Sequence, residues 1–238
     1  MLNSIFYLSL VASIISVASG IYFFLWWFRS ERRHLLLLYL AYGLGSLLLF
    51  KIPNILANAK IEIFQEDLYP FFFIALLLYF LAYFAFLRGL DFFSQFPQKN
   101  YINKLFIAWF GIAVTYFALS FFVQGPDGAI FPVWVGHILF YIPVQIYLLY
   151  KLFKLETKPK GKITVPQIGV YLAVLGVFVL LLTSIFYIFV QVRPYSQGFW
   201  YLSVISSPNI SILQIVSGIL LFFGFRILAK SYFQTPPK

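Results

Sequence analysis

Seven long apolar stretches dominate the sequence, and only short polar segments separate them. A helix needs about 20 residues to cross the roughly 30 Å hydrocarbon core of a bilayer, and each stretch is long enough. The predicted spans are Ser4–Phe28, His34–Asn58, Leu68–Phe92, Ile102–Val123, Phe131–Phe153, Val165–Gln191 and Ile205–Ala229. We therefore expect an all-α polytopic membrane protein, a seven-transmembrane-helix bundle that forms one domain over residues 1–238.

The composition agrees with this expectation and excludes several classes of protein. The chain is 62% hydrophobic and 10% charged, whereas charged residues make up about a quarter of a typical soluble domain. Because little chain remains between the apolar stretches, we expect no catalytic or receptor domain outside the membrane. The chain has no cysteine, which excludes disulfides, cysteine-ligated zinc and iron–sulfur clusters.

The distribution of lysine and arginine predicts the orientation of the helices, because cytoplasmic loops carry an excess of these residues. With seven spans, all but three of the 17 basic residues fall on one side of the membrane, and the exceptions are Lys51, Lys60 and Arg193. We expect the N-terminus outside, the C-terminus in the cytoplasm, and the plasma (inner) membrane as the location. The net charge of +10 is then explained by the membrane, and we expect no nucleic-acid partner.

The lysine-rich segment Lys151–Lys162 at the end of the fifth predicted span has two interpretations. The positive-inside rule favours contact with the lipid bilayer, through anionic lipid headgroups at the cytoplasmic face. The alternative is a docking site for an acidic protein partner. Nearer the membrane, Arg88 and Asp91 are three residues apart, a spacing that predicts an ion pair within one helix.

Small residues recur at helical spacing in several spans. The two clearest stripes are Ser9, Ser13, Ser16 and Gly20 in the first span and Gly169, Ala173 and Gly176 in the sixth. Such a stripe shares one helix face and lets two helices approach closely. We expect both stripes to pack inside the bundle, and the alternative is an interface between two copies of the chain.

Polar residues gather in the outer halves of several predicted spans, whereas the inner halves are almost wholly apolar. Within each span they recur three, four or seven positions apart, so they share a helix face. The candidate ligand-binding residues are Lys51, Asn54, His137, Tyr141, Tyr187, Gln191, Arg193, Ser211 and Gln214. If these faces converge, they form an aromatic and polar cavity that opens to the outside. The alternative is that the same side chains form hydrogen bonds between helices and bind no ligand.

Lys51 is the most specific single residue in this pattern. It follows His34 by 17 residues, about 25 Å along a helix and hence inside a roughly 30 Å hydrocarbon core. Its ammonium either extends to the outer interface or faces inward, where together with Arg193 it attracts an acidic ligand. Pro53 and Pro143 each remove one backbone hydrogen bond, so we expect a kink near both.

The sequence contains no constellation typical of catalysis, of a cofactor or of a metal. The two histidines, His34 and His137, enter the membrane from opposite sides, which excludes a bis-histidine haem site within one chain. The seventh span lacks the central lysine that a retinal pigment needs. We expect no enzyme, no cofactor and no metal, and a hydrogen-bonded structural role for His137.

These observations favour a binding or sensing module. We expect it to take up a small, partly apolar ligand, which can be acidic, from the outer side, and to signal through a separate partner. One alternative is a structural subunit of a larger membrane complex, which needs no catalytic residues. The other is a facilitative transporter of a small solute, which is disfavoured because the first three spans do not resemble the last three.

Overall fold

The computed structural model describes residues 4–30, 34–52, 55, 69–93, 100–123, 130, 132–156, 166–191 and 208–234. The regular elements in these ranges are all helical, which confirms the all-α fold for this part of the chain. The longer helices are α1 (Ser4–Arg29), α4 (Tyr69–Asp91), α5 (Asn100–Ala118), α7 (Ile142–Glu156), α8 (Gln167–Gln191) and α10 (Pro208–Gln234). The shorter ones include α2 (Leu35–Leu47), a 3-10 turn (Leu49–Lys51) and α6 (Val133–Gly136).

Six helical segments are long and apolar enough to cross a membrane. They are Phe6–Arg29, Tyr69–Asp91, Lys104–Val123, His137–Leu155, Gln167–Phe186 and Pro208–Phe233. Large apolar side chains such as Ile14 of α1 and Ile168 of α8 point out of the bundle, as contact with lipid requires. The chain is therefore a helical integral membrane protein.

The second predicted span differs from the structure. The sequence predicts one helix over His34–Asn58, whereas α2 ends at Leu47 and a 3-10 turn follows it. Leu48 leaves the helical conformation, with φ −109° and ψ 8°. The 13 residues of α2 extend about 20 Å, which is less than the thickness of the bilayer core. The described residues thus contain six long apolar helices and one short one.

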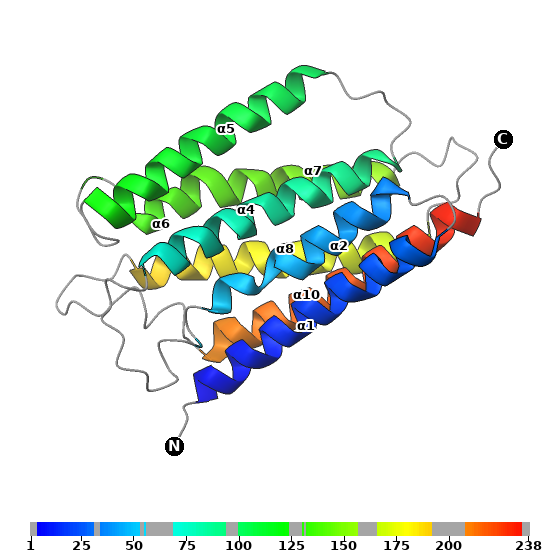
Figure 1. Ribbon diagram of the computed structural model, residues 1–238, viewed down its shortest axis with the longest axis horizontal. Helices are drawn as coiled ribbons and strands as arrows, with labels where there is room; N and C mark the ends of the chain where they lie inside the picture. The colour runs from blue at the N-terminus through cyan, green and yellow to red at the C-terminus, as the bar shows by residue number, and fades with distance from the viewer. Residues whose placement is uncertain are drawn as a thin grey trace.

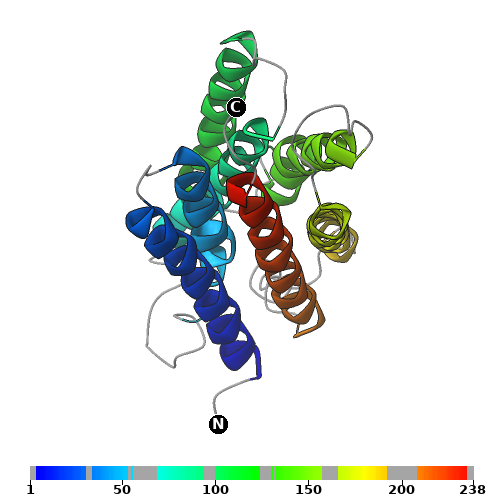
Figure 2. The same cartoon turned by 90° about the vertical axis from the view of Figure 1, so that its right-hand side faces the viewer.

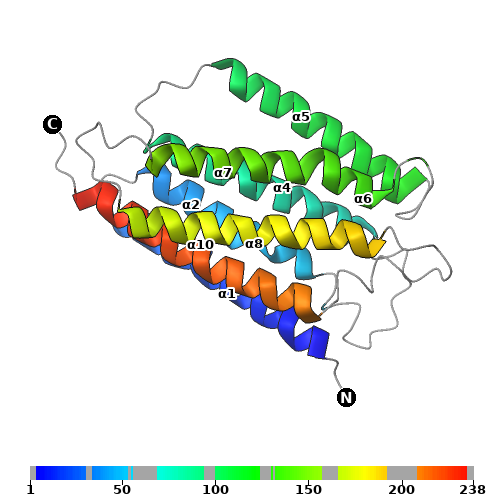
Figure 3. The ribbon, with the colours of Figure 1, turned by 180° about the vertical axis from the view of Figure 1, so that it is seen from behind.

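The helices lie side by side in a bundle, with α5 on its outside (Figures 1 and 3). Two pairs pack most closely, α1 with α2 and α8 with α10. Figure 2 shows α10 between α1 on one side and α8 on the other. Helix α5 contacts α4 and α6, and α4 and α7 contact the rest of the bundle.

Both small-residue stripes pack inside the bundle, as predicted. A Cβ on Gly20 of α1 would lie 2.6 Å from the Cα of Gly45 in α2, and a Cβ on Gly224 of α10 would lie 2.7 Å from the backbone nitrogen of Ala173 in α8. Ser16 also donates a hydrogen bond to the Gly45 carbonyl at 3.2 Å. Backbone therefore meets backbone at both interfaces, which larger side chains would prevent.

Aromatic rings fill much of the remaining space between helices. Phe86 of α4 stacks on Phe225 of α10 with ring centroids 5.0 Å apart, and Phe84 of α4 stacks on Phe106 of α5 at 4.5 Å. Each such pair adds about 0.5–1.5 kcal/mol to the stabilisation from burial alone. Part of the 22% aromatic content is therefore used for packing between helices.

Candidate functional site

Lys51 lies inside the helix bundle and not on its lipid-facing surface. It ends the 3-10 turn after α2, it is 0% exposed, and its Nζ donates a hydrogen bond to Ser211 Oγ at 3.1 Å. Ser211 is in the first turn of α10, 160 positions further along the chain. Lys51 therefore faces inward, and the interpretation that its ammonium extends to the outer interface is wrong. The attraction of an acidic ligand together with Arg193 stays a prediction.

A contact among α1, α10 and the end of α2 sets the position of Lys51 along the length of the bundle. The backbone N–H of Leu48 donates to Ser16 Oγ of α1 at 3.2 Å, and a Cβ on Gly218 of α10 would lie 3.1 Å from the Leu48 side chain. Helices α1 and α10 run in the same direction and α2 runs against them (Figure 1). The register of the three helices follows from this contact.

Five buried polar side chains lie beyond that contact, toward the end of the bundle where α1 and α10 begin. Ser13, Lys51 and Gln214 are each about one turn away from it, and Ser9 and Ser211 are further along the same helices. All five are 8% exposed or less. We refer to Ser9, Ser13, Lys51, Ser211 and Gln214 as the Lys51 cluster.

Three atoms of the Lys51 cluster are buried without a hydrogen-bond partner in the described part of the chain. They are Ser9 Oγ, Ser13 Oγ and Gln214 Oε1. A buried polar atom that lacks a partner costs about 1–3 kcal/mol. Burial of an ammonium itself costs several kcal/mol unless other groups compensate its charge. A bound polar molecule or an ordered water would satisfy these atoms.

A second polar cluster lies between α4, α7 and α8. Tyr83 donates to the Tyr79 hydroxyl at 2.6 Å, and the Gln145 amide donates to the Tyr83 hydroxyl at 2.7 Å and to Ser184 Oγ at 3.0 Å. Tyr83 and Gln145 are fully buried. These bonds connect three helices directly, which is the arrangement expected if polar residues serve packing rather than a ligand.

His137 and Tyr141 belong to the same region as this second cluster. The Tyr141 hydroxyl donates to the Leu76 carbonyl of α4 at 2.7 Å, and its ring lies 5.1 Å from the Tyr79 ring. Nδ1 of His137 lies 3.1 Å from the Val133 carbonyl, one turn earlier in the chain. Both side chains thus have protein partners, which supports the structural role predicted for His137.

The chain departs from a regular α-helix directly before Pro143. Residues His137–Tyr141 form a π-helical turn, and α7 begins at Ile142. Proline has no N–H to donate and interrupts the hydrogen-bond ladder, and a π-helical turn is one way in which a helix adapts. Pro53, the other predicted kink, lies outside the described residues.

Asp91, the last residue of α4, pairs with two cations. Its Oδ2 lies 3.7 Å from Nη1 of Arg88, which confirms the predicted ion pair within one helix. Its Oδ1 lies 2.5 Å from Nζ of Lys151 in α7. The network therefore connects α4 to α7 where the lysine-rich segment begins.

The described residues contain no group of three His, Cys, Asp or Glu side chains that could hold a metal ion. No known protein family, curated protein or solved structure matches this chain. Its function is therefore inferred from the two polar clusters and from the charged end of the bundle.

The structure brings together part of the predicted ligand site. Lys51, Ser211 and Gln214 lie in the Lys51 cluster, whereas His137 and Tyr141 lie with the second cluster. Tyr187 and Gln191 belong to α8, but their side chains are outside the described part of the structure, as are the residues Asn54 and Arg193. The five described candidates therefore divide between two regions of the bundle.

Sequence reasoning missed Gln145, and it assigned Ser9 and Ser13 to packing alone. Gln145 follows His137 and Tyr141 at four-residue steps, a helical repeat that could have identified it. Nothing in the sequence separates Ser9 and Ser13 from Ser16, which does contact α2. Only the lack of a partner for their buried oxygens among the described residues distinguishes them.

Proposed function

We propose that this protein is a membrane-embedded binding or sensing module that takes up a small, partly apolar, acidic ligand at the Lys51 cluster. The observation that carries the proposal is the buried Lys51 ammonium at the same end of the bundle as three buried oxygens without partners in the described chain. An ammonium attracts a carboxylate, serine hydroxyls donate to that carboxylate, and Gln214 Oε1 accepts from a hydroxyl or N–H elsewhere on the ligand. The apolar helices around the cluster suit the rest of such a molecule.

We further propose that α2 and the chain after it complete a seventh crossing, with the N-terminus outside and the C-terminus in the cytoplasm. The excess of basic residues on one side supports this orientation. The Lys51 cluster then faces the outer half of the plasma (inner) membrane, and the lysine-rich segment meets anionic headgroups at the cytoplasmic face. A separate partner protein would read the change in the bundle that binding produces.

Benzoate and benzamide provide a direct test, because they have similar shapes and differ in charge. The experiment measures thermal unfolding of the purified protein in mild detergent at increasing concentrations of each compound. A ligand that binds only the folded protein raises the unfolding temperature. We expect benzoate to raise it more than benzamide does, and we expect this difference to disappear in Lys51→Met.

Lys154→Met is the matched control, because Lys154 is an exposed lysine of α7 outside the Lys51 cluster. It should keep the full response to benzoate. Equal responses to benzoate and benzamide in the wild type, or an undiminished benzoate response in Lys51→Met, would refute the proposal. A stoichiometric protein partner in native mass spectrometry, with no response to benzoate, would support the structural subunit instead.

A further inference from the structure

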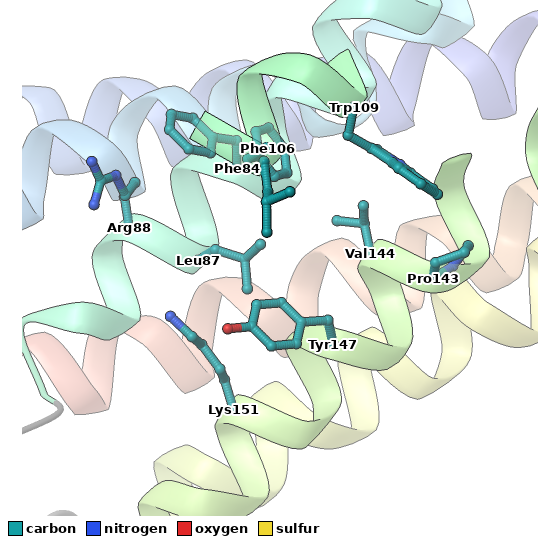
Figure 4. Close-up of a pocket in the computed structure, with 10 residues that line it drawn as sticks. Phe84, Leu87, Arg88, Phe106, Trp109, Pro143, Val144, Tyr147 and Lys151 are labelled. Carbon is teal, nitrogen blue, oxygen red and sulfur yellow. The ribbon is translucent and has the colours of Figure 1, made fainter. Parts of the chain in front are cut away.

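A pocket of about 380 Å³ lies between α4, α5 and α7, and none of its lining residues belongs to the Lys51 cluster (Figure 4). Its size falls in the range of roughly 300–1,000 Å³ that is typical of small-molecule sites. Most of its wall is apolar, formed by Phe84, Leu87, Leu105, Phe106, Trp109 and Val144. A long hydrocarbon chain is the kind of molecule that such a wall accommodates.

The charged residues of the pocket are at one end of it. Figure 4 shows the side chains of Arg88 and Lys151 at the same end and Trp109 at the opposite end. Asp91 pairs with both cations, so these three residues together carry one positive charge. The hydroxyl of Tyr147 also points toward the charged end (Figure 4). The pocket is therefore amphipathic along its length, with an apolar part and a basic end.

The position of α5 connects the pocket with the lipid. Helix α5 lies on the outside of the bundle, at an angle to α4 and α7 (Figures 1 and 3). Leu105, which lines the pocket from α5, is 64% exposed, and Trp109 is 39% exposed. Because this surface faces the membrane, the molecules that reach the pocket most readily are lipids.

We propose that this pocket binds one anionic phospholipid, with an acyl chain between α4, α5 and α7 and the phosphate at Arg88 and Lys151. A guanidinium and an ammonium both donate to phosphate oxygens, and basic pockets between membrane helices are known to hold acidic headgroups. The phospholipid comes from the leaflet that meets the basic ends of the helices. The site is separate from the ligand site proposed at Lys51.

A transmembrane helix of a partner fits the pocket less well. A helix is about 10 Å wide and rises 1.5 Å per residue, so a pocket of this size holds roughly one helical turn. A single acyl chain is narrower and flexible enough to follow the aromatic wall. The combination of an apolar channel with one net positive charge thus favours the phospholipid.

Native mass spectrometry in mild detergent tests this proposal with equimolar phosphatidylglycerol and phosphatidylcholine as the probes. We expect the wild type to retain one phosphatidylglycerol in preference to phosphatidylcholine. Lys151→Gln should lower this preference about fivefold, since one lysine near a lipid phosphate contributes about that factor. Val144→Phe should fill the pocket and reduce the retention of both lipids.

Two control variants on α7 and one second pocket variant complete the test. Lys154→Gln removes an exposed lysine outside the pocket, and Ile146→Phe enlarges an exposed side chain outside it, so both should retain phosphatidylglycerol like the wild type. Leu105→Trp narrows the pocket from its exposed wall and keeps the test valid if Val144→Phe does not fold. Equal retention of the two lipids by the wild type, unchanged retention by both pocket variants, or a second copy of the chain in place of lipid would overturn the proposal.

Discussion

Nζ of Lys51 and Oγ of Ser211 lie 3.1 Å apart, and their hydrogen bond joins the turn after α2 to the first turn of α10. Both side chains are fully buried. A buried ammonium is stable only when neighbouring groups compensate its charge. The hydroxyl that accepts its hydrogen bond therefore contributes more to stability than a hydroxyl in a bond between neutral groups does. The bond therefore has consequences for stability that are independent of any ligand.

We expect Ser211→Ala to lower the free energy of unfolding by about 1–3 kcal/mol, because the ammonium loses an acceptor and stays buried. Lys51→Met should cost less, since it removes the charge and leaves only an uncharged hydroxyl. Chemical unfolding in detergent micelles measures both variants. In the double variant the effects should not add, because the two residues share one interaction. Additive effects in that double variant would contradict the bond.

The backbone contact between α8 and α10 predicts that Gly224→Ala destabilises the protein. The added Cβ would lie 2.7 Å from the Ala173 nitrogen and 2.9 Å from the Gly169 carbonyl, and neither backbone can move alone. We expect a loss of about 1–3 kcal/mol, as for other overpacked sites. Gly111→Ala is the control, because a Cβ there meets nothing within 4 Å. It should be neutral or stabilising by up to about 1 kcal/mol.

The number of crossings can be tested with single cysteines, because the chain contains no natural cysteine. Asn3→Cys and Lys238→Cys place one thiol near each terminus. Seven crossings put the termini on opposite sides, whereas six put them on the same side. We expect a membrane-impermeant maleimide to label Asn3→Cys in intact cells and to label Lys238→Cys only after lysis. Labelling of both before lysis would show that α2 does not cross.

His34 should make the stability of the fold depend on pH. Its Nδ1 accepts the N–H of Leu36 at 3.3 Å as the N-cap of α2, and its Nε2 lies 3.1 Å from the Tyr232 hydroxyl. Burial lowers the pKa of this imidazole below its ordinary value, so the unfolded chain binds a proton more readily than the folded one. The stabilisation is complete above about pH 6.5 and decreases as the pH falls below that value.

Thermal unfolding between pH 5 and pH 8 measures this dependence. His34→Asn is the matched variant, because asparagine also caps helices and does not titrate. His137 is the only other histidine and is present in both proteins, so its contribution cancels in the comparison. The wild type should lose more stability on acidification than His34→Asn does. Parallel stability curves for the two proteins would show that folding does not lower the proton affinity of His34.

Most of the helices could be predicted from the sequence, because a continuous apolar run is a local property. The same holds for the stripes around Gly20 and Gly176, whose spacing already places them on one face. The early end of α2 could not be predicted. The residues around Leu48 are as apolar as those before it, and the 3-10 turn depends on contacts with α1 and α4.

The candidate site was harder to predict than the fold, because it depends on contacts between distant parts of the chain. Helical spacing marks Lys51, Ser211 and Gln214 as polar positions, but it does not say that Lys51 meets Ser211 across 160 residues. The same spacing marks His137 and Tyr141, which contact α4 and their own helix instead. Register within one helix is readable from sequence, whereas the choice of partner helix is made by packing.

The helix pairs α1–α2 and α8–α10 each form a rigid unit, because close backbone contacts prevent the two helices of a pair from sliding past each other. At the basic end of the bundle, the two pairs are joined by hydrogen bonds between Arg226 and Tyr22 and between His34 and Tyr232. At the other end Lys51 and Ser211 join them. An anion that competes with Ser211 for the ammonium would loosen one end while the other stays fastened. The bundle would then pivot about its basic end, and binding at the opposite end would change the angle between the helices.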